Sequence, residues 1–139
     1  ACIDGREVRA RPNSAGDRVA ALATQFMAAD DRDELHALAR RHFATEPIPR
    51  CAAESYPRLV LGRNDVALFQ RILPWDHAAG VLFLNEAGGI ATHWDGSEYM
   101  VGSGRKGVLA ASGPAAWWDA WNIWAPVLRA LAGPDGVPA

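Results

Sequence analysis

Residues 75–89 read Trp-Asp-His-Ala-Ala-Gly-Val-Leu-Phe-Leu-Asn-Glu-Ala-Gly-Gly. The apolar middle of this segment and the glycine pair behind it predict a helix from Asp76 to Glu86, with Asp76 as its N-cap. The preceding residues, 66–73, are apolar apart from two and predict a buried strand. Asp76 is therefore expected at a strand-to-helix junction, and such junctions face the ligand crevice of α/β sheets.

Strands and helices alternate on both sides of this segment. The hydrophobic pattern predicts strands at residues 19–26, 90–94 and 108–111, and helices at residues 30–44, 51–61 and 114–132. Asp4-Gly5 predicts a hairpin turn before them. This alternation favours one layered α/β domain over residues 1–132, with helices on both faces of the sheet and a frayed tail at 133–139.

Composition limits the classes of function. The 139 residues are 50% hydrophobic and 22% charged, with a net charge of −2 and no run of like charges. These values indicate a globular domain and argue against nucleic acid or an anionic membrane as a partner. No apolar run is long enough for a membrane span. Cys2 and Cys51 are interpreted as free thiols, and we expect a cytoplasmic protein. The chain starts on Ala1 without Met, so it is expected to be a piece of a longer protein.

Asp76 could cap its helix or hold a cation, and the two roles compete for the same oxygens. The helical rise separates it from Glu86, which is interpreted as structural. No pair of histidines has metal-ligand spacing on one helix face.

In the last predicted helix, Trp117, Trp121 and Trp124 share one face and predict core packing. Trp118 points away from them, which indicates a second buried surface such as a subunit contact.

The 75–89 segment resembles the second signature of the inositol monophosphatase family, with W-D before small residues and E-A-G-G behind an apolar helix. Residues 62–65 resemble the family's Gly-Arg-x-Asp turn, and residues 108–114 resemble its closing strand and the start of its last helix. The resemblance covers nearly the whole chain. It implies the C-terminal α/β domain of the family's αβαβα fold, in a Mg²⁺-dependent, lithium-sensitive phosphatase. There, paired Mg²⁺ ions bind phosphate and activate water, and the residue matching Asp76 is a metal ligand at the catalytic centre.

Two departures from the family pattern shape the expectation. The family's earlier acidic motifs, G-x-x-E and D-P-[IL]-D-G-T, are absent from this sequence. The remaining metal ligands are therefore expected from a missing N-terminal domain, and this chain alone is expected to be inactive.

The second departure concerns the substrate. Ala52 and Ala53 fall in the stretch that touches the sugar alcohol in the family. Phe69 matches the position of an inositol-binding Glu, with Gln70 one place later, and Phe accepts no hydrogen bond. The substrate therefore stays open among inositol, other sugar, histidinol and nucleotide phosphates.

The leading hypothesis is thus one half of a two-metal phosphomonoesterase acting on a small phosphorylated substrate, as a homodimer. The alternative is a non-catalytic α/β module for binding or dimerisation.

Overall fold

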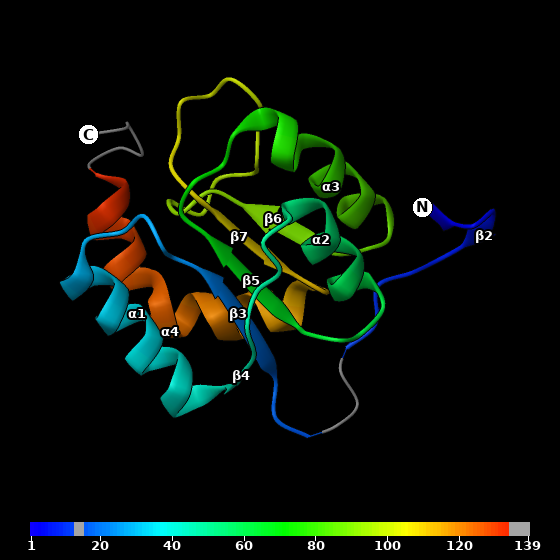
Figure 1. The fold of residues 1–139 in the computed structure, drawn as a ribbon. Coiled ribbons are helices and arrows are strands. Elements are labelled where there is room, and N and C mark those ends of the chain that lie inside the picture. Colours follow the sequence, from blue (N-terminus) through cyan, green and yellow to red (C-terminus); the bar gives the residue numbers. More distant parts are fainter. Residues whose placement is uncertain (13–15, 134–139) are drawn as a thin grey trace.

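The computed structural model describes residues 1–12 and 16–133 (Figure 1). Its elements follow the predicted alternation of strands and helices. In chain order they are β1 Cys2–Ile3, β2 Arg6–Glu7, β3 Val19–Ala23, α1 Ala29–His42, β4 Ala44–Thr45, α2 Ala52–Val60, β5 Val66–Phe69, α3 Pro74–Glu86, β6 Ile90–Thr92, β7 Val108–Ala111 and α4 Pro114–Ala132.

The main sheet has five strands in the order β4-β3-β5-β7-β6. β4, β3 and β5 are parallel, whereas β7 pairs antiparallel with both β5 and β6. Helices α1 and α4 lie on one face of the sheet, and α2 and α3 lie on the other (Figure 1). The predicted layered α/β architecture with helices on both faces is confirmed.

Alternation along the strands divides the core into two parts. In β5, Leu68 packs with the tryptophans of α4, and Phe69 packs with α2 and α3 on the opposite face. Trp117, Trp121 and Trp124 are buried as predicted. The fourth tryptophan, Trp118, is 57% exposed, so it does face away from the core.

The predicted Asp4-Gly5 turn is confirmed, but several element boundaries differ. Asp4 and Gly5 both adopt positive φ, 50° and 77°, in the turn between the antiparallel β1 and β2. β7 spans residues 108–111 as predicted, whereas β3, β5 and β6 end earlier than the runs that predicted them. The short strand β4 was not predicted. Residues 134–139 of the predicted tail lie outside the described residues.

The prediction that Asp76 caps its helix is wrong. Helix α3 begins at Pro74, and Leu73 occupies the cap position. Proline favours the first helical position because its φ is already helical and it has no N–H to satisfy. Asp76 therefore lies in the first turn, where its backbone N–H donates to the carbonyl of Leu73 at 3.0 Å.

Candidate functional site at the carboxyl edge of the sheet

The three parallel strands end at one edge of the sheet, and the predicted site residues belong to segments that meet this edge. β5 leaves the sheet there and continues into α3, whose first turn holds Asp76. Helix α2 packs beside α3 and runs back to the start of β5, so its first residues, Ala52 and Ala53, also lie toward this edge (Figure 1). The topology thus brings two helix N-termini together, and helix N-termini attract anions.

The side chain of Asp76 is open to solvent. It makes no hydrogen bond or ion pair with the other residues that the structure describes. The carboxylate benefits from the positive end of the α3 dipole. The Asp76 carboxylate makes no capping hydrogen bond. Capping and cation binding therefore do not compete for its oxygens.

Beneath Asp76, a buried polar pair joins α2 to α3. The hydroxyl of Tyr56 and Nδ1 of His77 lie 2.7 Å apart, and both side chains are almost fully buried. Burial lowers the pKa of His77, although the neighbouring Asp76 carboxylate and the backbone of Arg71 partly oppose it. Burial also raises the pKa of the Tyr56 hydroxyl. Both groups are therefore neutral near pH 7.

Gly80 allows the close approach of these two helices. A Cβ atom at Gly80 would lie 2.2 Å from a ring carbon of Tyr56, which is far inside van der Waals contact. The glycine of the W-D-H-A-A-G run is therefore a packing requirement of the Tyr56 ring.

The predicted substrate-binding residues fall into different environments. Ala53 is exposed and Ala52 is half-buried. Phe69 is 3% exposed, and its ring packs against Tyr56 and His77 with centroid separations of 5.6 and 4.8 Å. Its side chain therefore belongs to the core between the sheet, α2 and α3.

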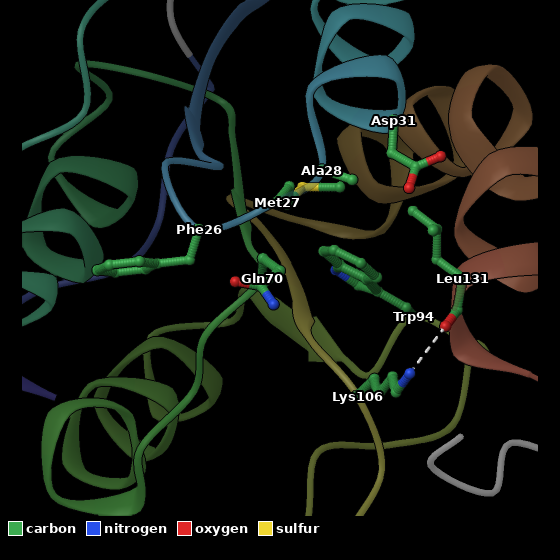
Figure 2. A pocket seen from close by; sticks show the side chains of 8 residues that line it. All are labelled: Phe26, Met27, Ala28, Asp31, Gln70, Trp94, Lys106 and Leu131. Atoms are coloured by element: carbon green, nitrogen blue, oxygen red, sulfur yellow. Dashed lines mark hydrogen bonds between the residues drawn. The ribbon is translucent and has the colours of Figure 1, made fainter.

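Gln70, the next residue, lines a cavity of about 270 Å³ at the same edge (Figure 2). Sequence reasoning missed this cavity, because its walls come from separate segments. They are Phe26, Met27, Ala28, Asp31, Gln70, Trp94, Lys106 and Leu131.

The described residues satisfy only part of a magnesium site. Carboxylate oxygen is the ligand that Mg²⁺ prefers, and Asp76 supplies it. Across residues 1–12 and 16–133, no group of three or more His, Cys, Asp or Glu side chains is placed to hold a metal ion. Asp76 fits one ligand position, and a complete shell needs ligands from outside these residues.

Comparison with known proteins decides the family. The model of the inositol monophosphatase family matches residues 1–126. The chain belongs to this family. A search among curated proteins found no significant match.

Solved structures of the inositol monophosphatase family share the fold. An inositol monophosphatase from Zymomonas mobilis has a TM-score of 0.72 and 23% identity, covering 86% of this chain and 47% of its own. The extragenic suppressor protein SuhB from Bartonella henselae has a TM-score of 0.71 and 19% identity, covering 91% and 48%. The enzyme SaIMPase-II, solved with 2′-AMP bound, has a TM-score of 0.74 and 17% identity, covering 91% and 49%. The chain therefore spans about half the length of these proteins.

Within the described part of the chain, none of the helices combines the length and apolar character that a membrane span requires.

Proposed function

We propose that this chain forms the C-terminal half of a Mg²⁺-dependent phosphomonoesterase and that Asp76 is one of its metal ligands. The family match over residues 1–126 supports the reaction class. The observation that carries the site is the exposed Asp76 carboxylate in the first turn of α3, with no partner among the described residues.

The residues of this chain would share the work with a preceding domain. When bound, Mg²⁺ would supply Lewis acidity toward the phosphoryl oxygens and a more acidic water. Asp76 would hold one metal, and the backbone N–H groups at the start of α2, at Ala52 and Ala53, would favour the phosphate anion. The preceding domain would supply the other carboxylates, so this chain alone would not turn over substrate.

The proposed substrate is a small phosphate ester. Phe69 is buried, so among the residues near β5 we assign substrate contact to Gln70. The structural similarity to SaIMPase-II, which binds 2′-AMP, supports a nucleotide as a candidate beside inositol, sugar and histidinol phosphates.

The test compares two carboxylates of one helix in the longer polypeptide that includes a preceding domain. We expect Asp76→Asn to abolish Mg²⁺-dependent phosphate release and to weaken Mg²⁺ binding, measured by isothermal titration calorimetry. Glu86→Gln, at the other end of α3, is the matched control and should change neither. Undiminished activity and Mg²⁺ affinity in Asp76→Asn would remove Asp76 from the metal site.

Trp118 supports the alternative of a dimerisation module, because a large exposed indole on α4 suits a subunit contact. If Trp118 is buried between two copies, Trp118→Ala should shift the chain from dimer to monomer in sedimentation velocity. A homodimer and a cytoplasmic location stay predictions of the sequence.

A further inference from the structure

Residues 70–76, which connect β5 to the first turn of α3, have few anchors of their own. None of these seven residues is buried, and Trp75 is 78% exposed. The start of α3 also has no side-chain cap. An uncapped helix end leaves backbone N–H groups without partners and tends to fray. Contacts at the two ends of this segment must therefore hold it, and Asp76 with it, against the domain.

Two aromatic rings close the base of this segment. Phe69 precedes it and His77 follows it, and both side chains are buried. Their ring centres lie 4.8 Å apart in an edge-on arrangement, with an interplanar angle of 75°. The chain thus leaves the core at Phe69 and re-enters it at His77, which is the first buried side chain of α3.

Tyr56 of α2 holds both rings from the neighbouring helix. Its ring stacks on Phe69 at 5.6 Å and meets His77 edge-on at 5.8 Å. Its hydroxyl lies 2.7 Å from Nδ1 of His77. Two buried rings and one buried hydrogen bond therefore fix the orientation of the imidazole.

The protonation state of His77 suits this arrangement. Burial lowers the pKa of His77, while the Asp76 carboxylate and a hydrogen bond with the backbone of Arg71 oppose this shift. The Arg71 group is its carbonyl, because only an acceptor favours a proton on the imidazole. A neutral histidine satisfies both partners when Nε2 carries the proton and Nδ1 accepts from the Tyr56 hydroxyl.

The carboxylate of Asp76 has no comparable anchor among the described residues, so its place depends on the backbone that carries it. That backbone is the turn from Leu73 to His77. The Asp76 N–H donates to the carbonyl of Leu73 at 3.0 Å, and the next side chain, His77, enters the core. Residues that hold a metal ligand in place typically change metal affinity about 10- to 100-fold when they are replaced.

We propose that Tyr56 and His77 are positioning residues for the metal-binding carboxylate of Asp76. Tyr56 holds the His77 ring, His77 holds the first turn of α3, and this turn directs the carboxylate. Neither residue contacts the metal or the substrate. The role of the pair rests on the proposed function, because it requires Asp76 to be a metal ligand.

The experiment uses the longer polypeptide that includes a preceding domain, and it measures Mg²⁺ affinity and stability separately. Tyr56→Phe removes only the hydroxyl and keeps the ring that packs on Phe69. It leaves the buried Nδ1 of His77 without its partner, so the midpoint of urea denaturation without Mg²⁺ should fall. We expect Mg²⁺ affinity, measured by isothermal titration calorimetry, to fall about tenfold. Saturating Mg²⁺ should restore kcat.

The double variant Tyr56→Phe with His77→Leu separates positioning from packing. Replacing both partners of a buried hydrogen bond by apolar groups is often nearly neutral for stability. The urea midpoint should therefore return toward that of the parent, while Mg²⁺ affinity stays about tenfold low. His77→Asn keeps a polar atom near the position of Nδ1 and should bind Mg²⁺ more tightly than His77→Leu. If Tyr56→Phe does not fold, His77→Asn and the double variant decide.

Thr92→Val is the matched control. It removes the acceptor of another buried hydrogen bond, which Nε1 of Trp117 donates at 3.0 Å on the α1/α4 face. This variant should lower the urea midpoint and leave Mg²⁺ affinity unchanged. If Mg²⁺ affinity simply follows the urea midpoint across all variants, or if Tyr56→Phe binds Mg²⁺ as the parent does, the pair has no positioning role.

Asp76→Asn distinguishes the two proposals. If this variant loses Mg²⁺ binding while Tyr56→Phe and the double variant keep it, the positioning role is rejected and the proposed function stands. If Asp76→Asn binds Mg²⁺ as tightly as the parent, Asp76 is no ligand, and both the proposed function and the positioning role are rejected.

Discussion

The two faces of the sheet are packed by different means. On the α1/α4 face, bulk fills the space: Trp117 and Trp121 stack at 5.2 Å, and the Trp124 ring lies 5.4 Å from that of Phe43. On the α2/α3 face, the two helices lie close together because Gly80 has no side chain to meet the Tyr56 ring. A buried hydrogen bond between Tyr56 and His77 also joins them. The family-identifying segment therefore serves mainly to bring α3 onto α2, and Asp76 is the residue of this segment that we propose as a metal ligand.

The largest expected effect falls on the bulk-filled face. Trp124 is fully buried and donates from Nε1 to the carbonyl oxygen of Leu35 at 3.2 Å. Trp124→Ala should lower the free energy of unfolding by about 3–5 kcal/mol, measured by urea denaturation. The matched Trp118→Ala, compared at a concentration where both variants are monomeric, should cost much less, because Trp118 is largely exposed and loses mainly its edge contact with Trp117. Similar losses in the two variants would mean that burial by α1 is not what stabilises this face.

A smaller effect tests close approach on the other face. Gly80→Ala should cost about 1–3 kcal/mol, the range for overpacking a filled core. Tyr56→Leu removes the ring that the new methyl group would meet. In the double variant, the added penalty of Gly80→Ala should therefore largely disappear. Strictly additive penalties would show that the ring does not limit helix approach.

The smallest effect is a pH dependence. The pKa of His77 is lowered by folding, so the unfolded chain binds this proton more readily than the folded chain does. Stability should thus be complete above the ordinary histidine pKa of about 6.5 and should fall as the pH drops through that value toward the folded pKa. His77→Asn should flatten this slope in urea denaturation between pH 7 and 5. His36, whose pKa is also lowered by burial and by Arg40, should account for a residual slope. An unchanged slope in His77→Asn would contradict the assignment.

Local patterns predicted most elements of this fold. The Asp4-Gly5 turn, the α4 helix starting at Pro114 and its buried tryptophan face are determined by neighbouring residues, and all three are confirmed. Boundaries were less predictable. The largely apolar run 66–73 predicted a longer β5, but residues 70–73 leave the sheet and lead into α3.

Long-range features could not be read from the sequence. β4 is only two residues long, and it pairs with β3 because α1 returns the chain to that edge. The cavity beside Gln70 depends on Trp94, Lys106 and the end of α4 meeting at one point, which no local spacing encodes. Asp76 was predicted as the N-cap because Asp favours that position. Pro74 favours the first helical position, so α3 begins two residues before Asp76.

The place of β7 in the sheet has a consequence for synthesis on the ribosome. This strand lies between β5 and β6, yet it follows both in the chain. Until residues 108–111 have been made, β5 and β6 have no strand between them. Their apolar side chains on the α1/α4 face also stay uncovered until α4 has been made. Folding is thus delayed until the final quarter of these residues has been made, and the nascent chain exposes aggregation-prone strand edges in the meantime.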